Sequence, residues 1–498
     1  MTACTMLPWR RVALWFLTAL VVRGALLVLP LDRIDQLFIP DDTYYSLAIA
    51  RHIAASGLPS ADGVIPTNGF QPLITLLEVP FFLLHANGDM AVFGAVLLSA
   101  TAGAAAAAGL GALVALTAGE AAGWLAAVIA SLHPTILSND LSGMETSLAA
   151  LLSLAAVLCA VRIRNDVSVL AGFAVGMICG LTALARVDTL LLVGVCGLVI
   201  VARAGVRAAA LVAAGALTVL LPWGVWIFTT SGALFPESGR AVRQLVLIHE
   251  ATDVGGLATG LVALCELGRL LPIASGISVA AAAAGLAVAA YLLWCPWRLG
   301  RTPLALFLLC NLALALIYCA YLPAFWFLSR YWHPLFLAAI GSWAALATRF
   351  WRQAGLPRAV AGGATIFLLA SSTWQTATHL VSRPDVFHGF REPARAISAD
   401  LARFSIVAAV QSGALGYYAP EGTRVINLDG VVNRFAWKAM HDHDLASYLR
   451  TTGVEAFADT DSMRRLIAGH AGAELPLTRV REMPDARGTP VTLFALSW

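Results

Sequence analysis

The sequence predicts an all-α polytopic membrane bundle followed by a small α/β domain. The chain is 59% hydrophobic and 12% charged, its mean hydropathy is +0.79, and long apolar stretches recur as far as Trp374. A helix needs ~20 apolar residues to cross a bilayer. The last part of the chain instead carries Asp, Arg and His at the density of a soluble domain. We therefore expect a transmembrane domain over residues 1–381 and a soluble domain over residues 382–498.

The apolar stretches predict about eleven transmembrane helices and exclude an ordinary soluble enzyme. The run after Arg10-Arg11 could be a cleaved signal peptide, but its length and Arg23 favour a retained helix. Segment 73–86 is short, and we expect it to be re-entrant or half-inserted, which leaves open whether it crosses. The expected crossings are residues 9–31, 91–117, 121–137, 145–161, 168–184, 188–202, 208–228, 274–294, 303–322, 333–348 and 359–376.

Five arginine clusters set the orientation, because basic residues are enriched in cytoplasmic loops. Placing all five in the cytoplasm gives a consistent alternation of the predicted helices. The N-terminus is then cytoplasmic, and an odd number of crossings puts the C-terminal domain outside. The net charge of +3 gives no indication of nucleic-acid binding. The clusters are Arg10-Arg11, Arg162/Arg164, Arg203/Arg207, Arg298/Arg301 and Arg349/Arg352/Arg358.

The acidic pair Asp41-Asp42 follows the first predicted membrane helix, in an outer loop expected over residues 32–72. Adjacent carboxylates beside a membrane are costly, and each raises the pKa of the other. They suit a general base or a cation site that faces a polar cavity. The alternative is a helix N-cap, since Pro40 precedes them and a helix is expected over residues 43–56. A cap uses one carboxylate and leaves the other free.

Other polar motifs fall on the same predicted outer face. Asn68 and Gln71 stand in a proline-bounded turn and are either hydrogen-bonding groups of a substrate cavity or parts of a plain loop. Glu145, Arg186 and Asp188 stand at helix ends, where such residues are often interface anchors. Arg186 and Asp188 could also pair with each other.

Arg330 stands between an aromatic-rich segment and Tyr331, at the outer end of a predicted membrane helix. The planar fork of arginine binds phosphate through two parallel hydrogen bonds, so Arg330 is a candidate for an anionic lipid headgroup. Arg240 is a weaker candidate for the same role. His333 is either a satisfied interface histidine or a catalytic group.

The remaining patterns point to packing and to a modest soluble fold. The eight cysteines lie in the hydrophobic part without metal-ligand spacing, which indicates core packing. There is no phosphate-binding loop, zinc-protease motif or nucleophilic serine elbow. In the C-terminal domain, strands are expected over residues 404–411, 424–429 and 454–459, with a helix over residues 442–450.

Taken together, the motifs resemble the GT-C superfamily of membrane glycosyltransferases, and are similar to a bacterial subgroup that includes the mycobacterial terminal arabinofuranosyltransferases. The resemblance covers most of the chain. Gln71 stands where this pattern leads us to expect a histidine, so no imidazole role carries over to that position. The motifs are the outer-loop acidic pair, Pro66-Thr67-Asn68-Gly69-Phe70-Gln71-Pro72, Gly143-Met144-Glu145-Thr146, Ala185-Arg186-Val187-Asp188, Ser238-Gly239, Ser329-Arg330-Tyr331 and Asn427-Leu428-Asp429-Gly430-Val431-Val432-Asn433.

The resemblance implies a multi-pass protein of the bacterial cytoplasmic membrane that transfers a sugar, with inversion, from a polyprenyl-phosphate donor to an extracytoplasmic glycan or lipid. It leaves a divalent cation undecided. A transporter or flippase of lipid-linked sugars is the alternative function. The candidate residues are Asp41 and Asp42 for catalysis, Arg330, Arg186 and Arg240 for the donor phosphate, and Tyr44, Asn68, Gln71, Glu145, Asp188, Glu237 and His333 for substrate binding.

Overall fold

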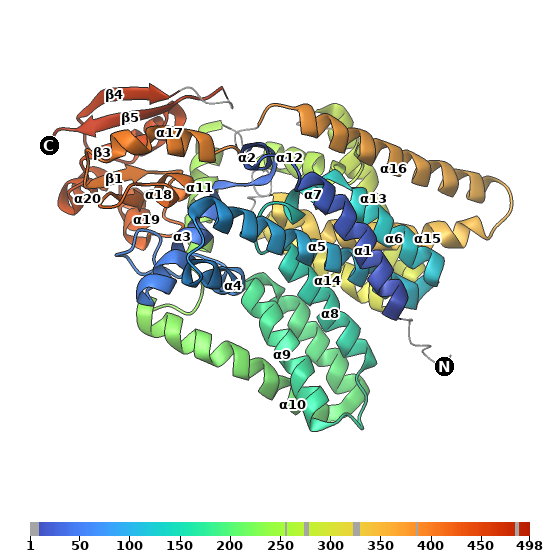
Figure 1. Ribbon diagram of the computed structural model, residues 1–498. Coiled ribbons are helices and arrows are strands. Elements are labelled where there is room, and N and C mark those ends of the chain that lie inside the picture. Colours follow the sequence, from blue (N-terminus) through green and yellow to red (C-terminus); the bar gives the residue numbers. More distant parts are fainter. Residues whose placement is uncertain (1–8, 254–255, 273–277, 322–328, 385–386, 484–487) are drawn as a thin grey trace.

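A large helical body and a smaller part built around one sheet make up the protein (Figure 1). The computed structural model describes residues 9–253, 256–272, 278–321, 329–384, 387–483 and 488–498. The helices of the body are α1 (Trp9–Leu26), α2 (Leu31–Phe38), α3 (Asp41–Ser56), α4 (Pro72–Leu83), α5 (Gly88–Ala118), α6 (Glu120–Leu132), α7 (Pro134–Asp140), α8 (Thr146–Arg162), α9 (Val169–Ala185), α10 (Leu190–Ser231), α11 (Ser238–Asp253), α12 (Gly256–Gly268), α13 (Val279–Leu299), α14 (Pro303–Tyr321), α15 (His333–Trp351) and α16 (Leu356–Val381), with short 3-10 turns η1 (Val187–Thr189) and η2 (Ser329–Trp332).

Each predicted crossing overlaps helix in its described residues, residues 274–277 and 322 lying outside them, but the expected number of about eleven spans is not confirmed. Four of the described helices are long and apolar enough to cross a membrane, and the number is six if the bent pairs α1–α2 and α6–α7 each count as one span. The predicted spans 188–202 and 208–228 lie on either side of a kink in α10, where Gly205 leaves the helical conformation (φ 78°, ψ 176°), so they remain two separate helical segments. Helix α4 has 12 residues, or about 18 Å, which is short of the bilayer's apolar thickness.

The expected core role of the cysteines agrees with the structure. The seven described cysteines are all free, and five of them are buried. Cys4 lies outside the described residues. Buried alanines and leucines of α5, α6, α8 and α15 form the largest core cluster, so the small side chains of these helices allow close packing of the bundle.

The C-terminal part is an α/β unit with one five-stranded sheet of order β2-β1-β3-β5-β4. Strands β1, β2 and β3 pair in parallel, whereas β5 is antiparallel to both β3 and β4. The three parallel strands coincide with the predicted ones. The sequence did not predict β4 and β5. Strand β4 is a charged, mostly exposed edge strand, so it shows no apolar alternation. The elements are α17 (Arg391–Leu401), β1 (Ile406–Ala409), α18 (Gly413–Tyr417), β2 (Arg424–Asn427), α19 (Arg434–His441), α20 (Leu445–Thr452), β3 (Ala456–Thr460), α21 (Asp461–Gly469), β4 (Leu477–Met483) and β5 (Val491–Leu496).

The first turn of α3 joins the two parts of the molecule. The buried carboxylate of Asp41 accepts hydrogen bonds from the backbone N–H groups of Gly413 (2.8 Å) and Ala414 (2.7 Å), at the start of α18. The turn between a parallel strand and its helix binds anions in many α/β folds. Here the anion is a side chain of the helical body. A Cβ on Gly413 would stand 2.2 Å from the Asp41 carbonyl oxygen, so this approach requires glycine.

A second junction forms around Arg391 at the start of α17. Its guanidinium pairs with Asp32 and, at 2.6 Å, with Asp89 at the start of α5. Tyr418 donates a hydrogen bond to the same Asp89 carboxylate at 2.9 Å. The C-terminal part is therefore anchored at two separate places on the helical body.

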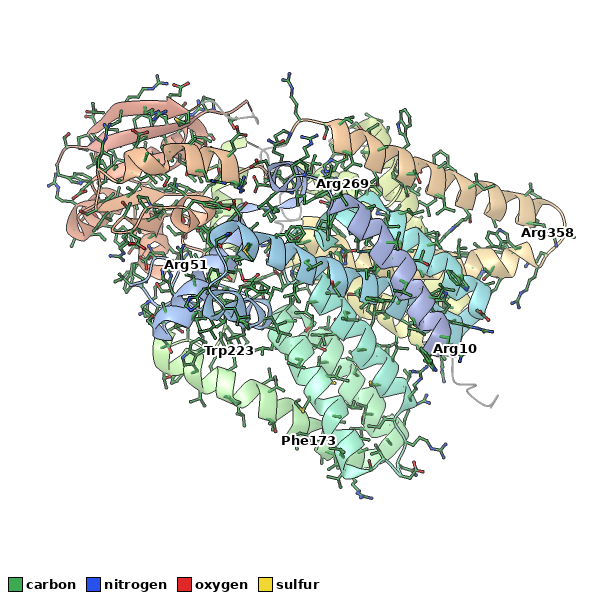
Figure 2. The ribbon with its side chains drawn as sticks, in the orientation of Figure 1. Arg10, Arg51, Phe173, Trp223, Arg269 and Arg358 are labelled. Carbon is green, nitrogen blue, oxygen red and sulfur yellow. The ribbon has the colours of Figure 1, made fainter. Side chains whose placement is uncertain are left out.

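Two of the five arginine clusters from which the orientation is predicted can be located through Arg10 and Arg358. Arg10 and Arg358 lie at the end of the helical body away from the sheet, whereas Arg51 lies near the C-terminal part (Figure 2). Arg51 donates a hydrogen bond to the carbonyl of Tyr417 at 2.9 Å. Which side of a membrane each end faces, and the domain boundary at residues 381/382, stay predictions.

We predict that Asp41→Asn weakens the attachment of the C-terminal part. The amide presents a donor to one of the two backbone N–H groups, so a charge-assisted hydrogen bond worth about 1.5–3 kcal/mol is lost. The melting temperature of the purified protein should fall, and chymotrypsin should cleave faster after the exposed Phe387, between α16 and α17. Asp166→Asn, at an exposed side chain in the loop between α8 and α9, is the control. Identical melting and cleavage in both variants would contradict the prediction.

Candidate active site

Asp42 and Arg330 form an ion pair across the helical body. The Asp42 carboxylate lies 2.7 Å from Nη2 of Arg330, and their side chains are 33% and 17% exposed. Arg330 also contacts the sulfur of Met144 at 3.1 Å. Successive residues of a helix point about 100° apart, so Asp42 faces this site while Asp41 faces α18. The adjacent carboxylates therefore have different partners and different access to water.

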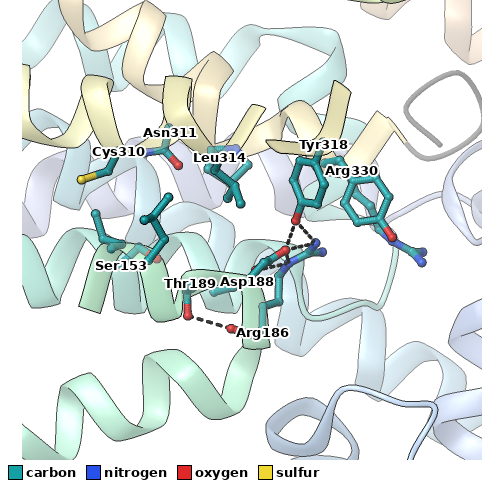
Figure 3. A pocket seen from close by; sticks show the side chains of 14 residues that line it. Ser153, Arg186, Asp188, Thr189, Cys310, Asn311, Leu314, Tyr318 and Arg330 are labelled. Atoms are coloured by element: carbon teal, nitrogen blue, oxygen red, sulfur yellow. Dashed lines mark hydrogen bonds and ion pairs between the residues drawn. The ribbon is translucent and has the colours of Figure 1, made fainter. Parts of the chain in front are cut away.

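Arg186 lies at the centre of a buried charge cluster beside this pair. Its guanidinium contacts Glu145 at 2.7 Å and Asp188 at 2.6 Å. The Tyr318 hydroxyl donates to the same oxygen of Asp188 (Figure 3). The ring of Tyr331 lies 5.2 Å from the Arg186 guanidinium and 4.5 Å from the ring of Tyr318. Two carboxylates, one guanidinium and two aromatic rings thus form a rigid polar wall.

A cavity opens next to this wall. It measures about 430 Å³, including space open to solvent. Its lining combines charged and aromatic groups at one end with apolar groups at the other (Figure 3). The charged and aromatic end includes Arg186, Asp188, Tyr318 and Arg330, and the mainly apolar end includes Cys310 and Leu314 together with the uncharged polar side chains of Ser153 and Asn311. This division suits a ligand with an anionic head and an apolar chain.

Three of the predicted substrate-binding residues support the structure around the site. The Tyr44 hydroxyl donates to Asp35 at 2.5 Å, and Tyr44 is fully buried. Asn68 donates to the carbonyl of Phe235 (3.0 Å) and accepts from the N–H of Glu237 (3.0 Å), so it fixes the segment before α11. Gln71 is the half-buried N-cap residue of α4.

The other candidates lie apart from the cavity lining. Glu237 is half-buried, and burial raises the pKa of its carboxyl while Arg434 and Arg240 lower it. Arg240 itself is exposed on α11. His333 is fully buried, and neither of its ring nitrogens has a hydrogen-bond partner among the described residues. The structure therefore brings together Asp42, Arg330, Arg186, Glu145 and Asp188 among the predicted residues.

Sequence reasoning missed Tyr318 and Asp429 as site residues. Tyr318 stands inside an apolar helix, where a lone tyrosine gives no functional signal. Asp429 follows β2 in the Asn427–Asn433 motif, but nothing in the sequence shows which part of the helical body it meets. Its Oδ2 lies 3.5 Å from the hydroxyl of Tyr45, which is one turn after Asp42 on α3. Burial raises the pKa of the Asp429 carboxyl to about 7; the Val431 N–H opposes this shift, and the charge of Asp42 adds to it.

Within the part of the chain that the structure describes, no group of three or more His, Cys, Asp or Glu side chains could hold a metal ion. A divalent cation stays undecided. The buried Arg23 is bonded to Asp140 through Nε at 3.0 Å, and Asp140 also accepts from Ser147. Arg23 is therefore half of a structural ion pair.

Three solved membrane proteins resemble the chain in shape, although neither a protein-family model nor a curated protein matches its sequence significantly. ArnT from Cupriavidus metallidurans, bound to undecaprenyl phosphate, has a TM-score of 0.57 at 15% identity, over 97% of both chains. The oligosaccharyltransferase AglB from Archaeoglobus fulgidus, in complex with an inhibitory peptide and a dolichol-phosphate, has a TM-score of 0.52 at 12% sequence identity. The match covers 96% of this chain and 74% of the AglB chain.

The arabinofuranosyltransferase AftD from Mycobacteria has a TM-score of 0.48 at 18% identity, over 99% of this chain and 40% of its own. That likeness is too distant in shape to carry weight. At such identities the matches to ArnT and AglB show the fold alone. They confirm the predicted architecture of a helical bundle with a C-terminal α/β part, without its number of crossings. The chain has the fold of the GT-C membrane glycosyltransferases, of which ArnT and AglB are solved examples.

Proposed function

We propose that the protein is an inverting glycosyltransferase that moves a sugar from a polyprenyl-phosphate donor to a hydroxyl of an extracytoplasmic glycan or lipid. The observation that carries this proposal is the Asp42–Arg330 ion pair beside the cavity, because it places a potential base next to a potential phosphate ligand. Structures of this fold in complex with undecaprenyl phosphate and with a dolichol-phosphate support a lipid-phosphate donor. The apolar end of the cavity would receive the first part of the lipid chain.

In the proposed reaction, Asp42 takes the proton of the acceptor hydroxyl as that oxygen attacks the anomeric carbon. The new bond joins the acceptor oxygen to the sugar, and the bond between the sugar and the phosphate breaks. The lipid phosphate leaves with the electron pair, and Arg330 stabilises its charge. One base and one leaving-group ligand suffice for inversion.

The resting ion pair links the two roles. A donor phosphate competes with Asp42 for the guanidinium of Arg330, so donor binding would release the carboxylate to accept a proton. The guanidinium of Arg186 is already bonded to Glu145 and Asp188, so it is less available to bind the donor phosphate. We assign Arg186 to the wall that orients Arg330 through Tyr331.

Asp42→Asn should fold normally and lose turnover by about 10²-fold or more, because the amide cannot take the proton. The measurement is transfer from an undecaprenyl-phosphate sugar by the purified protein in detergent. Asp62→Asn is an unsuitable control because Asp62 pairs with Arg424; Asp166→Asn, on an exposed loop, serves instead. Full turnover in Asp42→Asn would remove Asp42 from the reaction.

Arg330→Lys should be impaired, and Arg330→Ala more so. Lysine keeps the charge but lacks the planar fork, whereas alanine leaves the departing phosphate without a counter-charge. Titration of the donor lipid against each purified variant measures the effect on affinity, and Arg164→Ala, at an exposed side chain, is the matched control. If Arg330→Ala binds and turns over the donor normally, the phosphate ligand lies elsewhere, with Arg186 or Arg240 as the next candidates.

The C-terminal part should face the outside of the cell. The arginine clusters and the odd number of predicted crossings both require this side. Reporter fusions after Trp498, one active only in the cytoplasm and one active only outside it, measure the side directly. A cytoplasmic signal from the fusion at Trp498 would overturn the whole orientation, and with it an outer-face active site.

A further inference from the structure

The segment that follows β2 enters the space between the two parts of the molecule. A Cβ on Gly69 would stand 1.7 Å from the carbonyl oxygen of Val431. The backbone of the first outer loop therefore packs directly against the backbone of this segment. The side chain of Val431 packs with Tyr318 and Tyr331, which line the cavity. The C-terminal part thus forms one boundary of the candidate active site.

The segment is held firmly by Asn427. Its Nδ2 donates to the hydroxyl of Tyr45 on α3 at 2.8 Å, and its Oδ1 accepts from the N–H of Gly430 at 3.0 Å. The carbonyl of Asn427 accepts from Asn433 at 2.9 Å. These bonds fix the turn on both sides of Asp429, so the direction of the Asp429 side chain is set before any ligand binds.

The two oxygens of Asp429 have unequal partners. Oδ1 accepts the Val431 N–H at 2.7 Å, whereas Oδ2 lies 3.5 Å from the Tyr45 hydroxyl, and the Asn427 side chain also contributes a hydrogen bond to the carboxylate. Each carboxylate oxygen can accept about two hydrogen bonds. Among the described residues Asp429 forms no ion pair, in contrast to Asp42 with Arg330 and Asp188 with Arg186. Oδ2 therefore keeps the capacity to accept hydrogen bonds from a ligand.

Asp429 also lies close to the proposed base. Tyr45 and Asp42 are three residues apart on α3 and share a face of that helix. Burial is the main cause of the raised pKa of the Asp429 carboxyl, and the charge of Asp42 raises it further. Apart from the hydrogen bond that it accepts from the Val431 N–H, a second carboxylate in this place is unfavourable, because like charges repel. It suits the recognition of a group that carries several hydroxyl donors.

We propose that Asp429 binds the acceptor: Oδ2 accepts a hydrogen bond from a sugar hydroxyl next to the one that attacks, and so turns the attacking hydroxyl toward Asp42. This assignment rests on the proposed glycosyltransferase function and adds to it the class of acceptor, a polyhydroxylated sugar end. It also gives the C-terminal part a direct role, since one of its side chains then contacts the substrate.

Steady-state kinetics of the full-length protein tests the assignment. The donor is an undecaprenyl-phosphate sugar and the acceptor an octyl glycoside, each chosen as the compound that native protein uses best. Asp429→Asn keeps an oxygen for the Val431 N–H, so it should fold with an unchanged melting temperature. We expect its acceptor KM to rise about tenfold or more, with kcat within a few-fold and donor affinity unchanged, because a hydrogen bond to a charged group is lost. Asp42→Asn should instead lower kcat and leave the acceptor KM nearly unchanged.

Deoxy acceptors supply a second readout that a merely structural role would not move. Removing the hydroxyl that Asp429 binds should raise the KM of the native protein, and Asp429→Asn should then cause no further rise with that acceptor. Asp442→Asn, at an exposed carboxylate of the C-terminal part, is the matched control. Transfer with an unchanged acceptor KM in Asp429→Asn overturns this assignment alone. Absence of transfer by native protein with every donor tried overturns the proposed function and the assignment with it.

Discussion

The attachment of the C-terminal part to the first turn of α3 is the constraint on which the site depends. Asp41 supplies an anion to the backbone N–H groups at the start of α18, and one turn later Tyr45 accepts from the Ser412 N–H at 3.1 Å. These contacts fix the N-terminal end of α3. Asp42 lies between them in the chain, so its carboxylate is held in one place beside Arg330, which lines the cavity.

Helix geometry gives the two carboxylates of the acidic pair different partners. Two adjacent residues of a helix point in directions about 100° apart, so one carboxylate faces the soluble part and the other faces Arg330. A buried carboxylate that accepts two backbone hydrogen bonds is held in place and is closed to an acceptor hydroxyl. The partly exposed Asp42 carboxylate is paired with the Arg330 guanidinium. It can act as a base once Arg330 binds the donor phosphate instead. The pair thus combines a structural anion with a reactive one.

The wall around Arg186 gives this arrangement its rigidity. Removing one member of a buried ion pair leaves the other uncompensated, at a cost of about 3–5 kcal/mol. Glu145, Asp188 and Tyr318 therefore hold Arg186 strongly, and Tyr331 stacks between Arg186 and Arg330. A fixed wall beside one movable ion pair allows a charged head group to enter without a rearrangement of the helices.

The sequence alone determined the helical class of the body, the position of each long apolar helix, the three parallel strands and the outer-loop acidic pair. These follow from local composition and periodicity, which the chain carries without reference to distant residues. The tertiary structure decided the rest. Asp42 meets Arg330 across 288 positions, and Asp41 meets Gly413 across 372. No local pattern encodes such pairings, because they depend on how the two parts pack. For the same reason the edge strand β4, the wall residue Tyr318 and the approach of Asp429 to the site became visible only in the folded chain.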